Sequence, residues 1–378
     1  MQPMTSPPAP TPAPAASTLP AVPDAPVVSP LAPTLVTLAA AARNAWAISP
    51  WGEGIESYPG LPTAIVYDEP HRQLRHYLHT SPATEPRPVL LVPPLAVSAR
   101  CYDLRHGQSL AAHLMHSGRD TYVIDYGEIT FADRHMGLEQ WIDDILPTAV
   151  RALSERHGGA QVDVVGWSLG GTMSVLTAAA HPRLPIASLT AYGTPVDYRL
   201  IPAVQPLRAL DNLLGGRAVT TATAAAGGVP RHVVRGMFRA MAPVREVTKP
   251  LFLARNILDT EVLARTEAVD RFIGSMPGYP GRAYNQIHSR LIVANELYKG
   301  AVHLGDRVVR LCDIRTRVLF VGSRTDSIAN GPAVAAGARV VPGARYQAVD
   351  GMSHLGLIAG PAAPARSWPV LDRFLADA

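Results

Sequence analysis

From about residue 60 the sequence alternates short β-branched runs with stretches of helical spacing, and this alternation constrains the fold more than any other feature. Strands separated by helices form right-handed βαβ units, so the chain is predicted to be an α/β protein with a mainly parallel sheet flanked by helices. Ligands of such sheets bind beyond the carboxyl ends of the strands, where functional residues are therefore expected. Strands are predicted at residues 63–67, 89–92, 121–125, 162–165, 187–192 and 317–321, and helices at residues 108–116, 138–157 and 169–181.

The sharpest motif is the sequence GWSLGG at residues 166–171, which lies between the predicted strand 162–165 and a predicted helix. A serine in G-x-S-x-G sits on a strained turn that projects its hydroxyl above the sheet, and the glycines leave room for the neighbouring strand and helix. The start of the helix aims N–H groups and its positive dipole end at the reacting oxygen. Ser168 is therefore predicted to be a catalytic nucleophile, with the N–H of Leu169 as one donor of an oxyanion hole.

A serine hydroxyl needs a base that takes its proton and a third group that orients this base. After a serine on such a turn, the acid comes next along the chain and the histidine follows it. Asp326, in the loop after the predicted strand 317–321, fits the acid, and His354, in the sequence GMSHLG, fits the base. Asp197, which follows another predicted strand, is an alternative acid, and His288 is an alternative base.

Further residues are expected around the reacting ester. The second oxyanion donor should lie in the loop after the predicted strand 89–92. The two prolines that begin this loop have no N–H, which leaves Leu95 or Ala96, and Leu95 is favoured. Trp167, beside the nucleophile, and Asp125, at the end of a predicted strand, are candidates for the substrate pocket, although a structural role stays open for both.

The domain organisation follows from where the predicted strands stop. Residues 1–55 are expected to form a Pro/Ala-rich disordered tail with a short helix, because eleven of the 36 prolines fall within the first 34 residues. Residues 56–197 and 314–378 are expected to form the α/β core, and residues 198–313 a mostly helical cap, or lid, inserted before the acid-bearing strand.

The predicted cap contains large apolar residues, some of which are expected to line an acyl channel. Its helices are predicted at residues 207–214, 233–241, 251–262 and 283–298. The large apolar side chains in question are Met237, Phe238, Met241, Leu251, Phe252, Phe272 and Met276.

Composition excludes several classes of protein. The net charge is +4, but the arginines are scattered among acids, so no basic stripe for nucleic acid is predicted. Cys101 and Cys312 cannot build a disulfide framework or a zinc site by themselves, and no metal or cofactor is expected. No transmembrane segment is predicted, and no positive segment precedes an apolar run as in a signal peptide. The protein is therefore expected in the cytoplasm.

A family likeness runs collinearly through roughly residues 60–375. It is carried by VPPL at 92–95, YVIDYGE at 122–128, TPVDY at 194–198, NELYKG at 295–300 and the loops that contain Asp326 and His354. In these stretches the chain resembles polyhydroxyalkanoate synthases. The resemblance implies an α/β-hydrolase fold with a cap and supports the roles assigned to Asp326 and His354. The chain departs from the synthases at the nucleophile, where they carry cysteine and this sequence has Ser168.

A serine in place of cysteine changes the expected chemistry. An oxyester on Ser168 is less activated toward transfer than a thioester, and the same Asp–His pair can deprotonate water instead. We therefore expect a serine esterase or lipase that cleaves apolar acyl esters. Two alternatives stay open: an acyltransferase or polyhydroxyalkanoate synthase acting on (hydroxy)acyl-CoA, and a non-catalytic protein that coats lipid or polymer inclusions. A location at the surface of such inclusions and a homodimer are both compatible with the sequence.

Overall fold

The fold is built on one twisted sheet, seen in a computed structural model that describes residues 34–79, 82–213, 218–241 and 243–377. The sheet has eight strands in the order β1-β2-β4-β3-β5-β6-β11-β12. The pairs from β4 to β12 are parallel, while β1–β2 and β2–β4 are antiparallel. The predicted α/β class with a mainly parallel sheet is therefore confirmed. The strands are β1 (Thr63–Tyr67), β2 (Gln73–Tyr77), β3 (Val89–Val92), β4 (Thr121–Asp125), β5 (Val162–Trp167), β6 (Ile186–Tyr192), β11 (Arg317–Gly322) and β12 (Arg345–Ala348).

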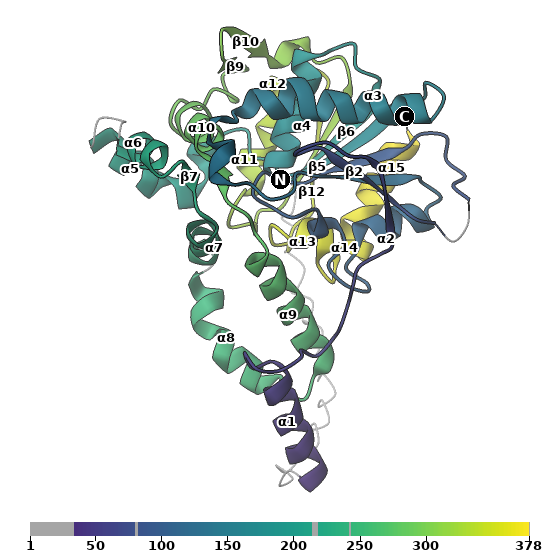
Figure 1. Ribbon diagram of the computed structural model, residues 1–378, viewed down its shortest axis with the longest axis vertical. Helices are drawn as coiled ribbons and strands as arrows, with labels where there is room; N and C mark the ends of the chain where they lie inside the picture. Colours follow the sequence, from purple (N-terminus) through teal and green to yellow (C-terminus); the bar gives the residue numbers. More distant parts are fainter. Residues whose placement is uncertain (1–33, 80–81, 214–217, 242, 378) are drawn as a thin grey trace, which may run out of the picture.

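Side chains of the central strands are buried on both faces of the sheet. In β3, Leu90 and Val92 join one hydrophobic cluster, whereas Val89 and Leu91 join another. Helices α3 (Leu146–Arg156) and α4 (Leu169–Ala180) cover the first face. The second face is covered by α2 (Leu110–His116) and by α13 (Gly356–Ala359), α14 (Ala363–Arg366) and α15 (Trp368–Ala376) (Figure 1). Burial on both faces explains why these strands read as continuous apolar runs.

Residues 198–313 carry most of the helices outside this core. Two predicted helices are wrong in their extent. The predicted helix 251–262 is broken, because Asp259 caps a new helix by accepting a hydrogen bond from Val262 N. The predicted helix 283–298 ends before Asn295, whose positive φ of 53° does not continue a helix. The helical elements are α5 (Gln205–Leu213), α6 (Ala218–Ala225), α7 (Arg231–Ala240), α8 (Pro243–Arg255), α9 (Thr260–Gly274), α10 (Gly281–Gln286) and a π-helical segment (Ile287–Val293).

Two small antiparallel pairs complete this region. β7 (Gly228–Val229) pairs with β8 (Tyr279–Pro280), and β9 (Ala301–Leu304) pairs with β10 (Arg307–Arg310). Val302, Leu304 and Val309 are buried in the same cluster as α4, so the end of this region packs directly on the core.

An arm projects from the body of the molecule. Figure 1 shows α1 (Leu35–Ala47) and α8 reaching farthest from the sheet, α7 between α8 and the body, and α9 running beside α8 back to the body. α1 lies within the predicted tail of residues 1–55, of which residues 1–33 lie outside the described residues. Several apolar side chains on the arm are exposed, among them Leu35, Val36, Val247 and Leu251. Within the described part of the chain, no helix combines the length and apolarity that crossing a bilayer requires.

Candidate active site

Ser168 lies on the turn between β5 and α4, as the motif predicts. Its backbone has φ 54° and ψ −124°, a strained conformation for a non-glycine residue, and its N–H donates to the carbonyl of Tyr192 on β6 at 2.8 Å. A Cβ on Gly166 would come within 2.6 Å of Gly171 Cα, and one on Gly170 would lie 2.1 Å from the carbonyl oxygen of Val92. The glycines are therefore required by the close approach of α4 to β5 and to the loop after β3.

Asp326 and His354 form a buried pair. The Nδ1 of His354 lies 2.7 Å from Asp326 Oδ2; His354 is 4% exposed and Asp326 is 2% exposed. The other carboxylate oxygen accepts hydrogen bonds from the N–H groups of Ile328 and Ala329, at 2.8 and 2.9 Å. The loops after β11 and β12 thus bring the predicted acid and base together, and the second ring nitrogen of His354 is left to exchange a proton.

Residues next to Ser168 in the chain and in the sheet contact His354. Trp167 Nε1 donates to the carbonyl oxygen of His354 at 3.1 Å, and the two rings lie 5.0 Å apart. Gly193, which follows the residue bonded to Ser168 N, has a positive φ of 53°, and a Cβ there would lie 3.1 Å from the His354 ring. The GWSLGG motif alone does not predict these two contacts. Among the described contacts, no hydrogen bond joins Ser168 to His354, which is common in catalytic sites without substrate.

The loop after β3 is held against the start of α4 by two tyrosines. The hydroxyl of Tyr102 donates to the carbonyl of Val92 at 2.7 Å, and that of Tyr126 donates to the carbonyl of Pro93 at 3.1 Å. Burial raises the pKa of each phenol well above the usual value for tyrosine. Both hydroxyls therefore stay protonated and can donate these hydrogen bonds. Sequence reasoning did not identify either tyrosine.

The predicted oxyanion donors lie on the two segments that this packing brings together. Leu95 follows the anchored carbonyls, and Leu169 is the first residue of α4, where a helix leaves its N–H groups without intrahelical partners. In the described structure, neither the Leu95 nor the Leu169 N–H donates a hydrogen bond to another residue. Both remain available to a substrate oxygen, and their role stays a prediction.

The alternative acid and base lie in other environments. Asp197 accepts hydrogen bonds from Asn295 at 2.8 Å and from Arg199 at 3.2 Å. Although burial opposes its charge, these hydrogen bonds keep the pKa of Asp197 below its usual value. His288 is buried in the cap, 3.8 Å from Asp211, and burial lowers its pKa. The geometry therefore favours Asp326 and His354 as the acid and the base.

The two proposed pocket residues differ in position. Trp167 contacts both His354 and Phe272 of α9, whose ring centroid lies 6.3 Å away. Asp125 ends β4, two strands from β5, where it accepts from Gly127 N at 3.0 Å and lies 3.3 Å from Arg75 Nε. Its contacts here stabilise the strand end, and a role in the pocket stays a prediction.

The apolar residues predicted for an acyl channel divide into two groups. Phe272 and Met276 are buried in the cluster that contains Trp167, and Met237 and Phe238 pack against it. Leu251 and Phe252, by contrast, are 54% and 45% exposed on the arm. The first group thus packs with Trp167, next to Ser168 in the chain, and an acyl channel there stays a prediction.

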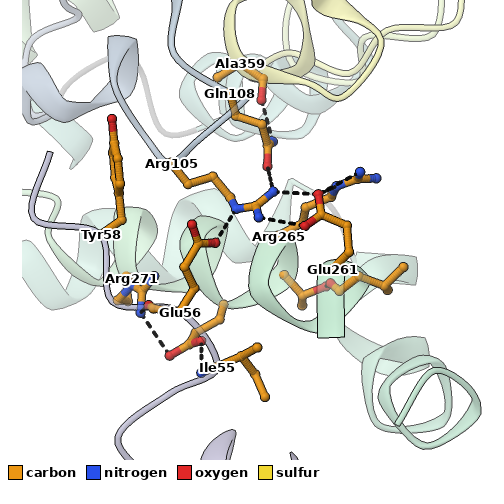
Figure 2. Close-up of polar contacts among 12 residues, drawn as sticks. Ile55, Glu56, Tyr58, Arg105, Gln108, Glu261, Arg265, Arg271 and Ala359 are labelled. Carbon is orange, nitrogen blue, oxygen red and sulfur yellow. Dashed lines mark hydrogen bonds and ion pairs between the residues drawn. The ribbon is translucent and has the colours of Figure 1, made fainter. Parts of the chain in front are cut away.

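Ion pairs tie α9 to the core (Figure 2). Arg105, only 6% exposed, donates to both carboxylate oxygens of Glu261 at 2.8 and 2.7 Å and to Glu56 at 2.7 Å. Gln108 accepts from Arg105 and donates to the carbonyl of Ala359, close after His354 in the chain. We call these contacts the Arg105 tether. It connects the cap to the segment that carries the candidate base.

A cavity of about 510 Å³ lies where the cap meets the core. Its lining includes Arg134, Arg282 and Arg290 together with His135 and His303, and it does not include Ser168. Arg134 and His135 belong to a short helical segment (Phe131–His135) after β4, and the other lining residues lie in the predicted cap. Its lining would suit an anionic group.

Comparison with known proteins agrees with this architecture. A model of the alpha/beta hydrolase fold family matches residues 87–361, more than half of the chain. The chain is also similar to a poly(3-hydroxyalkanoate) polymerase subunit PhaC from Haloferax mediterranei, with 24% identity over 84% of this chain and 64% of that protein. The same-named subunits of Allochromatium vinosum and Synechocystis sp. are each 27% identical; they cover 71% and 73% of this chain, over 74% and 76% of their own lengths. The chain thus spans less than two thirds of the first of these relatives.

Proposed function

The chain belongs to the alpha/beta hydrolase fold family, and on that premise we propose that it is a serine hydrolase that cleaves apolar acyl esters through an acyl-enzyme on Ser168. The observation that carries the proposal is the buried Asp326–His354 pair. Trp167, the residue before Ser168, donates to the backbone carbonyl of His354, its ring lies 5.0 Å from the imidazole, and Gly193 leaves room for that imidazole. A nucleophile, a base and an orienting carboxylate in this arrangement are what acyl transfer to a hydroxyl requires.

The proposed reaction begins when Ser168 Oγ attacks the carbonyl carbon of the ester. His354 Nε2 takes the serine proton, and Asp326 stabilises the imidazolium through the Nδ1 hydrogen bond. The oxygen of the tetrahedral intermediate accepts from the N–H groups of Leu169 and Leu95. The alcohol leaves with the proton from His354. A water molecule, deprotonated by the same imidazole, then hydrolyses the acyl-enzyme.

The test uses pure protein with p-nitrophenyl esters of graded acyl length and with a fluorophosphonate label. We expect ester turnover and labelling of Ser168 in the wild type, and loss of both in Ser168→Ala. Because the nucleophile itself is removed, turnover should fall by at least about 10³-fold. Ester turnover that persists in Ser168→Ala would show that the reaction does not use this serine.

A second candidate function is acyl transfer from an acyl-CoA, supported by the similarity to the polymerase subunits and by the arginine-lined cavity. Three arginines and two histidines would suit the phosphates of CoA. Incubation with 3-hydroxybutyryl-CoA separates the two functions: release of free 3-hydroxybutyrate supports a hydrolase, whereas insoluble product supports a transferase.

Ser168→Cys provides the matched variant for this distinction. A thioester is better activated toward transfer than an oxyester, so the cysteine should favour polymer over free acid if the nucleophile decides the outcome. If both proteins release only free acid, the surrounding site, rather than the serine, determines that water is the acceptor.

A non-catalytic function as a coat of lipid or polymer inclusions is supported by the exposed apolar side chains of the arm. Val247 is 81% exposed and Leu35 is 85% exposed, and large exposed apolar patches mark association sites. Binding of Ser168→Ala to triacylglycerol droplets or polymer particles would reveal such a role independently of catalysis. Substituting Val247 and Leu251 with Ser should weaken that binding, and unchanged binding would exclude the arm.

A further inference from the structure

Three histidines surround one aspartate at the edge of the sheet opposite Ser168. Asp120 immediately precedes β4, His76 is on β2, His79 follows β2, and His157 follows the end of α3. The Nε2 atoms of His76 and His79 lie 2.9 and 3.3 Å from Asp120 Oδ1, and the Nε2 of His157 lies 3.8 Å from Oδ2. All four side chains are partly shielded from solvent, with His79 only 11% exposed.

The cluster is separate from the candidate active site. β4 runs parallel to β3 and β5, so Asp120 lies at the amino ends of these strands and Ser168 at their carboxyl ends. A strand of five residues spans about 16 Å, which sets the scale of the separation. The cluster therefore does not take part in the chemistry at Ser168.

The distances within the cluster suit a metal ion. One ligand atom from each of His76, His79 and Asp120 lies within 4.8 Å of the other two. Tetrahedral Zn²⁺ with bonds of about 2.0–2.1 Å places its ligand atoms about 3.3 Å apart. The observed separations of 2.9 and 3.3 Å to Asp120 Oδ1 are close to that value.

One atom of the cluster makes no hydrogen bond. The Nε2 of His79 is buried and lies 3.3 Å from Asp120 Oδ1, but the two make no hydrogen bond of good geometry in the described structure. A buried polar atom without a partner is costly, and a neutral imidazole nitrogen is a metal ligand. His76 Nε2 forms a hydrogen bond with Asp120 Oδ1 at 2.9 Å, as His71 and His113 do with their own carboxylates. The cluster differs from those pairs because a second imidazole, that of His79, faces the same oxygen.

We propose that His76, His79 and Asp120 form a binding site for a divalent transition-metal ion, with Zn²⁺ as the fitting ion. Two imidazoles and one carboxylate favour Zn²⁺, Ni²⁺ or Cu²⁺ over Mg²⁺ and Ca²⁺, which prefer oxygen ligands. A water molecule takes the fourth position, because the Nε2 of His157 forms a hydrogen bond with the Tyr122 hydroxyl at 3.0 Å. The sequence alone did not suggest this site, because the third ligand, Asp120, lies 41 positions after His79 in the chain.

The site would stabilise the fold. β2 pairs with β4 in the antiparallel sense, outside the parallel part of the sheet. A metal held by β2 and by the segment before β4 would fasten the β1–β2 hairpin to that part. An ion that binds only the folded chain raises the free energy of unfolding in proportion to its occupancy.

The test uses tag-free full-length protein, stripped with EDTA and titrated with Co²⁺, whose visible absorption reports imidazole coordination. One ion per chain, displaced by Zn²⁺, and a Zn²⁺-dependent rise in Tm are expected. His79→Ala should bind at least about tenfold more weakly and lose the rise in Tm. His113→Ala, which removes a histidine from a simple His–Asp pair, is the matched control and should bind as the wild type does.

Two results would overturn the proposal: no binding at metal concentrations on the order of 100 µM, or equal binding by the wild type and His79→Ala. The ring of His76 stacks on Tyr122 at 4.4 Å, so His76→Ala could also disturb the fold. Asp120→Asn, which keeps the size of the side chain, is therefore the second variant. Ester turnover should stay unchanged in His79→Ala, so failure of this proposal is distinguishable from failure of the proposed function.

Discussion

The carboxyl edge of the sheet and the cap arm are built in different ways. At the sheet edge, Asp326 and His354 are almost fully buried, and both oxygens of Asp326 accept hydrogen bonds. The arm is joined to the core through the Arg105 tether, in which Glu261 is 52% exposed. The arm also exposes apolar side chains to solvent. Removing one partner of a buried pair costs much free energy of folding, whereas removing one partner of an exposed ion pair costs little. The difference predicts that substitutions in the Asp326–His354 pair have much larger effects than substitutions in the Arg105 tether.

The largest effect is expected from Asp326→Asn at the carboxyl edge of the sheet. An amide cannot orient the His354 tautomer or stabilise its imidazolium, so kcat should fall by about 10⁴-fold. Turnover of a short p-nitrophenyl ester measures this, with circular dichroism to confirm the fold. Asp197→Asn is the matched control, because Asp197 also follows a strand of the sheet but pairs with Arg199. Loss of turnover in the control alone would reassign the acid.

The next largest effect should come from Leu95→Pro, which removes the N–H assigned to the oxyanion hole. Loss of one such donor lowers kcat by about 10² to 10³-fold. Leu95→Ala keeps the N–H and removes a buried side chain, so it should cost stability while kcat of the folded enzyme is retained. Equal losses of kcat in the two variants would mean that Leu95 acts through packing and not as a donor.

The carboxyl edge was largely predictable from the sequence. Its strands are apolar runs buried on both faces, and the glycines around Ser168 mark a turn that few other conformations allow. The contacts of His354 with Trp167 and Gly193 were not predictable. They depend on the register between β5 and β6 and on how the loop after β12 folds back, and no local pattern records either.

The cap and the outer strands were harder to predict for a physical reason. β2 carries the polar sequence QLRHY and lies second from the sheet edge, where alternation is weak. The start of α9 depends on a single capping residue, Asp259, within a long helical pattern. The Arg105 tether joins residues more than 150 positions apart, and only the folded chain shows that Glu56 and Glu261 meet.

A smaller effect is expected in the cap from Arg105→Met. This variant keeps the length of the side chain and removes its hydrogen bonds to Glu56 and Glu261. Because Glu261 is half exposed, the free energy of unfolding should fall by only about 1–2 kcal/mol, as measured with urea. The kcat for short esters should stay near the wild-type value, while KM for long acyl chains should rise a few-fold. A collapse of kcat for short esters would show that the tether supports the base directly, through Gln108 and Ala359.

The smallest effect concerns the pH dependence of the same contact. Hydrogen bonds from Arg105 lower the pKa of Glu261 from 4.5 to about 2. A carboxyl whose pKa is lower in the folded state stabilises the fold fully above its unfolded value and loses this contribution as the pH falls. The Tm difference between the wild type and Glu261→Gln should therefore be constant above about pH 5 and shrink between pH 4.5 and about 2. Because the Glu261 carboxylate is half exposed, 0.5 M salt should also reduce the difference at neutral pH. A difference that resists salt would place the tether among the buried pairs and remove the contrast between the cap and the sheet edge.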